Sequence, residues 1–117
     1  MKWLAVVMAF VAFVFAGCGA TYVKVKNSST SNFGNVDVCV KDNCALKVQF
    51  NSVNKDALTD QAEWTHSDSL TVTITTSSPS KGDETNGVAL TEGEVNVITV
   101  ETGTNSSDDI KYAVATE

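Results

Sequence analysis

Hydrophobic and polar residues alternate with a period of two along most of the chain. Seven segments carry this alternation, and polar stretches rich in Ser, Thr, Asn and Asp separate them. The segments are residues 22–26, 36–41, 46–50, 70–75, 88–90, 95–100 and 110–114. A period of two sends successive side chains to opposite faces of an extended chain. Each segment therefore predicts a β-strand with one buried face.

Two segments depart from this simple pattern. In residues 95–100 the apolar parity shifts at Val97 and Ile98, which predicts either a β-bulge or burial on both faces. Asp56 to Trp64 is the one helical candidate, with two apolar residues on a common face and a candidate cap at Asn54. This second segment predicts a turn of helix or an irregular crossover between the two halves of the chain.

The remaining features of the chain favour one all-β domain. Short strands separated by polar turns are typical of an antiparallel sandwich or a small barrel. No linker, charge block or repeat divides residues 21–117 of the 117-residue chain, and Pro79 is the one proline. We expect a single β-sandwich domain over residues 18–117, with about seven strands.

Residues 1–17 have the composition of an export signal. Lys2 is followed by an uninterrupted apolar run from Trp3 to Ala16. As a helix this run would rise about 21 Å, which is too short for a hydrocarbon core of about 30 Å. The segment therefore predicts an N-terminal signal helix that directs export, rather than a transmembrane anchor.

The end of this apolar run resembles a bacterial lipobox. Phe15 and two small residues precede Cys18, in the place of the cysteine that receives diacylglycerol; Phe15 departs from the aliphatic residue usual there. The resemblance implies a lipoprotein-type signal peptide over residues 1–17 and a membrane anchor through lipid on Cys18. Gly19, rather than Asp, resembles lipoproteins sent to an outer membrane. The alternative is ordinary cleavage after Ala20, which would give a secreted protein without lipid.

Composition excludes several classes of partner and activity. The chain has 8 basic residues, 14 acidic residues and a net charge of −6. Without a basic stripe, nucleic acid is a poor partner, and charge alone would not hold the protein on anionic lipid. With one His and no Arg, most catalytic constellations lack their parts. We expect no enzymatic activity and no cofactor.

Two cysteines remain after Cys18. Cys39 and Cys44 enclose a turn-rich tetrapeptide between two alternating segments, and in an oxidising compartment we expect them to form a disulfide. Because the enclosed loop is so small, the disulfide would stabilise the fold only locally, by about 2 kcal/mol. Strict alternation places Cys39 on the polar face and Cys44 on the apolar face, so pairing requires a parity shift before Leu46. Their spacing is not the Cys-x-x-Cys of thiol oxidoreductases.

Residues 23–29, 35–42 and 88–100 carry a family resemblance. They are similar to the opening strand, the N-V-D-V-Y-V-D-G segment and the L-x-x-G-x-x-Y-T-V segment of a secreted bacterial family, domain of unknown function 4397. Cys39 and Asn96 depart from the Tyr typical of that family. The resemblance implies an immunoglobulin-like β-sandwich at the cell envelope, and it carries over no catalytic residue.

Trp64 and His66 are the candidate contacts for a ligand or partner. His66 is the only histidine and stands beside Ser67 and Asp68, but a triad needs three side chains that converge from separate elements. Along a strand, His66 and Asp68 would share one face while Ser67 faces away. A single His also makes no zinc site unaided. The alternative is a polar strand or loop with Trp64 in the core.

Two acidic loops, residues 81–87 and 105–109, place several oxygen atoms close together. Calcium takes 6–8 such ligands, but neither loop has the spacing of an EF-hand. Polar turn chemistry is the favoured explanation of both loops, and we predict no metal site. Asn27 and Asn105 begin N-glycosylation patterns, which matter only in a host that glycosylates.

Together these features predict a non-enzymatic cell-envelope lipoprotein, located at the outer membrane, whose sandwich is a binding, adhesion or structural module. Its partners would be the membrane, through the lipid on Cys18, and an unidentified protein or glycan. One alternative is a small periplasmic inhibitor or accessory factor of an envelope hydrolase, with Asn51 to Ser69 as its loop and Trp64 as its anchor. Another is a secreted sandwich without a lipid anchor.

Overall fold

The computed structural model describes residues 19–81, 84–103 and 109–117, and all its regular elements are strands. The predicted signal helix and Cys18 lie outside these residues. Seven strands overlap the predicted segments, and the short β4 is additional. The strands are β1 (Thr21–Ser28), β2 (Phe33–Val40), β3 (Asn43–Val53), β4 (Ala62–Trp64), β5 (Thr71–Ser77), β6 (Glu84–Ala89), β7 (Val95–Thr102) and β8 (Ile110–Thr116). Within the described ranges no helix is long and apolar enough to cross a membrane.

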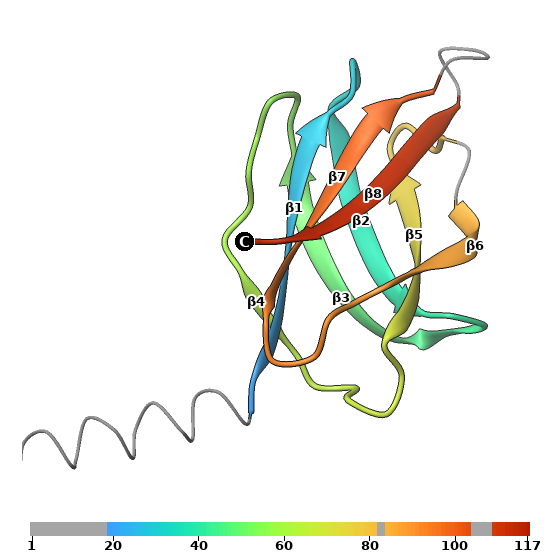
Figure 1. Cartoon of the computed structure of the whole chain (residues 1–117). Coiled ribbons are helices and arrows are strands. Elements are labelled where there is room, and N and C mark those ends of the chain that lie inside the picture. Colours follow the sequence, from blue (N-terminus) through green and yellow to red (C-terminus); the bar gives the residue numbers. More distant parts are fainter. Residues whose placement is uncertain (1–18, 82–83, 104–108) are drawn as a thin grey trace, which may run out of the picture.

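The strands form two four-stranded sheets that face each other (Figure 1). One sheet has the order β4-β1-β7-β8 and the other has the order β3-β2-β5-β6. The predicted all-β sandwich is confirmed. All strand pairs are antiparallel except β1 and β7, which run parallel over seven residue pairs. The alternation in the sequence did not predict this parallel pair.

The core lies between the sheets and is built from the inward positions of the alternating strands. Val23 and Val25 of β1 and Val36 and Val38 of β2 are fully buried, as the alternation predicted. Burying one such side chain contributes about 1.5–3 kcal/mol. The other buried apolar residues are Phe33, Val40, Phe50, Val53, Trp64, Val72, Ile74, Leu90, Ile98, Val100 and Tyr112.

β7 contains no bulge, because its register with both neighbours runs without a shift. Asn96, Ile98 and Val100 point inward and are fully buried, while Val95 and Val97 on the outer face are half-buried. Of the two predicted alternatives the bulge is therefore wrong, and burial on both faces holds, with the outer face only half-buried. The apolar parity shifts because Asn96, a polar residue, occupies an inward position of a central strand.

Of the two alternatives predicted for residues 56–64, the turn of helix is wrong and the irregular crossover is confirmed. The backbone N–H of Thr59 donates to the Val25 carbonyl at 2.9 Å, and the Thr59 hydroxyl accepts from the Val25 N–H at 2.9 Å. Leu58 forms an isolated bridge with Lys26, and β4 continues along the same edge of β1. These bonds satisfy the edge of β1, which a short helix of weak propensity could not do.

Cys39 and Cys44 form the predicted disulfide, with their Cα atoms 4.7 Å apart. The register of β2 and β3 shifts at this point, because Cys39 pairs with Lys47 while Val40 pairs with Asn43. The predicted parity shift is thus confirmed. The expected position of Cys44 on the apolar face is wrong: Cys44 is exposed and Cys39 is fully buried. The extra residues of the shifted hairpin carry Cys44 away from the core.

Asn27 is fully buried at the end of β1, and its amide joins three parts of the chain. Nδ2 donates to the carbonyls of Ser31 at 2.8 Å and Val53 at 3.0 Å, and Oδ1 accepts from the N–H of Ser29 at 3.0 Å and its hydroxyl at 2.6 Å. The amide has thereby reached its full hydrogen-bonding capacity. This side chain cannot carry a glycan in the folded protein, so the glycosylation pattern at Asn27 has no role there.

Asn96, at the opposite end of the β1–β7 pair, also joins neighbouring parts of the chain through its side-chain amide. Nδ2 donates to the carbonyls of Tyr22 at 3.2 Å, Thr91 at 3.1 Å and Glu94 at 3.2 Å. Oδ1 accepts from the Thr91 N–H at 2.8 Å. The amide therefore fixes the turn between β6 and β7 to the beginning of β1.

Replacing Asn27 with Ala should lower the free energy of unfolding by about 2–4 kcal/mol, because buried groups of Ser29 and Val53 lose their partners. Urea denaturation measures this difference. Asn51→Ala is the matched control, since Asn51 is exposed and its loss should cost less than about 0.5 kcal/mol. Equal stabilities of the two variants would contradict the role assigned to Asn27.

Candidate functional site

The candidate contact residues Trp64 and His66 lie at the end of the sandwich where β1 begins. Trp64, in β4, stands opposite Thr21 in the pairing of β4 with β1. Its side chain is in the core, with 2% exposure, and its Nε1 donates to the carbonyls of His66 at 3.0 Å and Ser69 at 3.1 Å. Trp64 therefore holds the turn formed by residues 66–69 and presents almost no ring surface to a partner.

His66 is half-buried against the edge of Trp64, with ring centroids 5.0 Å apart and an interplanar angle of 81°. The Ser69 N–H donates to the His66 carbonyl at 2.9 Å and closes a turn. Residues 66–69 therefore form a turn, and not the strand along which His66 and Asp68 would have shared one face. Among the hydrogen bonds of the described residues, none joins the imidazole to either of those side chains. The structure does not bring the three groups together as a triad.

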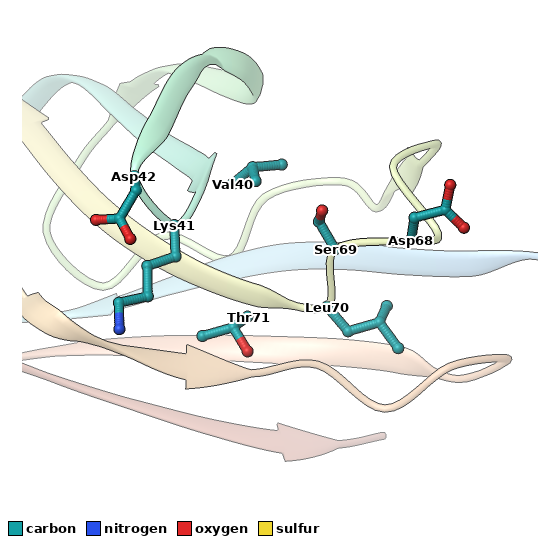
Figure 2. A pocket seen from close by; sticks show the side chains of 7 residues that line it. All are labelled: Val40, Lys41, Asp42, Asp68, Ser69, Leu70 and Thr71. Carbon is teal, nitrogen blue, oxygen red and sulfur yellow. The ribbon is translucent and has the colours of Figure 1, made fainter.

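Three shallow hollows surround this turn. The first, of about 290 Å³, lies between Lys41 and Asp42 on one wall and Asp68 to Thr71 on the other (Figure 2). The second, of about 310 Å³, extends from the turn to Leu46. The third, of about 390 Å³, adjoins Gly19 and the beginning of β1. The second hollow shares Asp68 and Ser69 with the first, and it shares Thr65 and Ser67 with the third.

The chemistry of the hollows suits surface contact. Their walls combine hydroxyl and carboxylate groups with apolar surface, to which Leu70 contributes in the first hollow and Leu46 in the second. Enclosed ligand pockets are mostly apolar, with a few polar groups that fix the ligand. Open hollows of mixed polar and apolar character instead favour contact with a larger surface, in which water is only partly displaced.

The predicted loop from Asn51 to Ser69 does not project from the sandwich, since much of it lies along the edge of β1. Its exposed apolar side chain is Leu58, with 55% exposure. Leu46 is 40% exposed although its parity in the sequence predicted an inward position. Leu46 lies directly beside the register shift, where the regular pairing of β3 with β2 ends at Lys47. The exposure of Leu46 and Leu58 was not predicted from the sequence, because it depends on how the neighbouring segments pair.

Several other predicted sites fall wholly or partly outside the described residues. Cys18 and Asn105 lie outside them, as do parts of both acidic loops, at residues 82–83 and 104–108. In the part of the chain that the structure does describe, no three His, Cys, Asp or Glu side chains are grouped to hold a metal ion.

Comparison with known proteins supports the fold and goes no further. No protein-family model matches the chain, and no curated protein matches it. The structure is similar to an NMR structure of a protein from Eubacterium rectale, with a TM-score of 0.62 and 13% identity over 86% of this chain and 93% of that chain. Such a likeness concerns the β-sandwich alone. The resemblance to domain of unknown function 4397 stays a prediction.

Replacing Trp64 with Phe keeps a ring in the core and removes the donor that holds the turn. We expect a loss of about 1–2 kcal/mol in the free energy of unfolding and faster hydrogen exchange at the Ser69 amide. Tyr22→Phe is the control, because Tyr22 is half-buried and its change should cost less than about 0.5 kcal/mol. Unchanged exchange at Ser69 in Trp64→Phe would show that the indole does not hold the turn.

Proposed function

We propose that this protein is an exported, non-enzymatic lipoprotein of the cell envelope. Its β-sandwich would serve as a binding, adhesion or structural module. The observation that carries the proposal is the place where the fold begins. β1 starts at Thr21, three residues after Cys18, the cysteine that resembles a lipid-attachment site.

The beginning of β1 is firmly built into the sandwich, which suits attachment at this point. Thr21 is 3% exposed, and its hydroxyl accepts from the Gly93 N–H at 2.9 Å. The Tyr22 N–H donates to the Glu94 carbonyl at 3.0 Å. A lipid on Cys18 would therefore be joined to a rigid body through a very short linker.

The membrane is the first partner under this proposal, and Gly19 favours sorting to an outer membrane. A protein or glycan would be the second partner, bound by the polar turns that a rigid scaffold positions. The net charge of −6 still disfavours nucleic acid. The resemblance to domain of unknown function 4397 agrees with this assignment to the envelope.

The inhibitor or accessory-factor alternative needs an anchor other than Trp64, which is buried. Leu58 is the side chain that favours it, because it is apolar, 55% exposed and carried by the crossover beside β1. Apolar anchors that fill a partner's pocket dominate many interfaces. The remaining alternative, a secreted protein without lipid, requires cleavage after Ala20.

Replacing Cys18 with Ala should abolish lipid attachment and move the protein from the membrane fraction to the soluble fraction of a lipoprotein-processing bacterium. Intact mass and cell fractionation measure the two effects. Ala20→Ser is the matched control and should keep both the lipid and the membrane location. An unmodified wild-type protein that begins at Thr21 would contradict lipid anchoring and favour the secreted alternative.

A further inference from the structure

We infer that the protein stands end-on at the membrane, an orientation that rests on the proposed lipidation of Cys18. The end of the sandwich with the turn 66–69, here called the near end, would face the lipid surface. The opposite end, here called the far end, would face outward. β1 begins at the near end with Thr21 and runs away from it to Ser28 (Figure 1).

The linker between lipid and fold is too short to allow free rotation of the domain. Three residue steps separate Cys18 from Thr21, and an extended chain spans at most about 3.6 Å per residue, or about 11 Å in all. The first residues of β1 do not leave the sheet to lengthen this linker, because Thr21 is buried and pairs with Trp64. The near end would therefore lie within about 11 Å of the lipid attachment point.

The near end includes two turns besides the beginning of β1. Gly19 lines the same hollow as Glu63 and Ser67, so the turn after β4 lies beside the linker. The Gly93 N–H donates to the Thr21 hydroxyl, so the turn between β6 and β7 lies there as well. These two turns would be the parts of the sandwich nearest to the lipid headgroups.

Carboxylates dominate the charge of the near end. Glu63, Asp68, Glu92 and Glu94 are all exposed, and Lys41 lies across the first hollow from Asp68. Anionic headgroups repel such a surface over roughly a Debye length. The lipid would hold the domain at the membrane, while this repulsion keeps the near end from sinking among the headgroups.

The flanks of the sandwich offer little compensating attraction, because most of their lysines are matched by acids; Lys26, exposed on β1, stands opposite Thr99 instead. In three cases a lysine on an outer sheet face contacts or faces an acidic residue: Lys24 with Glu117, Lys47 with Asp37, and Lys111 with Glu101. Attraction to an anionic leaflet grows with unmatched basic charge. The domain therefore gains little by lying on either flank.

The far end is then the surface presented to a partner. The amide of Asn27 holds the connections at the far end through its bonds to the carbonyls of Ser31 and Val53. The Lys55 N–H donates to Oδ1 of Asn32 at 2.7 Å. Thr30, Asn32 and Ser80 are exposed there. This surface is rich in hydroxyl and amide groups, and its connections are held by the hydrogen bonds of Asn27 and Asn32.

Energy transfer from single dyes to a headgroup-labelled lipid tests this orientation. The full chain is expressed in a lipoprotein-processing bacterium with Ser67→Cys at the near end, Gln49→Cys midway along β3, or Ser80→Cys at the far end. Each lipidated variant is labelled and reconstituted in vesicles of phosphatidylcholine and phosphatidylglycerol. The disulfide between Cys39 and Cys44 leaves the introduced thiol free for the dye.

We expect transfer to fall from position 67 to position 49 to position 80. The last dye should lie about 25 Å farther from the lipid surface than the first, since the eight residues of β1 rise about 3.3 Å each. Equal transfer at positions 67 and 80, or the reverse order, would overturn the end-on orientation and leave lipid anchoring intact. Absence of lipid on Cys18 in the intact mass would overturn the anchoring, and the orientation with it.

Discussion

The parallel pairing of β1 with β7 places the first strand of the sandwich in the interior of a sheet. β1 lies between β4 and β7 and keeps its register with β7 over seven residue pairs. A buried asparagine stands at each end of this pair, Asn27 opposite Val100 and Asn96 opposite Val23. The two amides hold the β1–β2 turn, the start of the β3–β4 connection and the β6–β7 turn against the pair.

The two amides and the apolar core contribute in different ways. Burial of valine and isoleucine supplies most of the stability, but many arrangements of the strands would bury these side chains. A buried amide is costly unless its donors and acceptors are all paired. Asn27 and Asn96 meet that condition only when their particular turns close against β1 and β7. They therefore help to select this topology among the alternatives.

The period-two pattern predicted seven strands and the inward valines, because alternation directly reports which face of a strand is buried. β4 was missed because three residues carry too little pattern, and its pairing depends on the edge of β1. The same parity that buries Val23 and Val25 also places Asn27 inward, so its burial was readable from the sequence. The exposure of Leu46 could not be read from the sequence, because Leu46 lies beside a register shift between β2 and β3. Of the two candidate contact residues, Trp64 belongs to the core. The position of His66 depends on the turn that the Trp64 indole holds through its hydrogen bonds.

The proposed anchoring requires the first strand to be as firmly held as the core, so that a lipid on Cys18 would be joined to a rigid body. Chain termini commonly open before the rest of a domain, and native-state hydrogen exchange separates the two cases. We predict that the amides of Lys24 and Lys26, which point toward β7 as that of Tyr22 does, exchange only through global unfolding, with the free energy that urea denaturation gives. Exchange at these amides much faster than at Val38 and Ile74 would contradict it, because β1 would then open by itself.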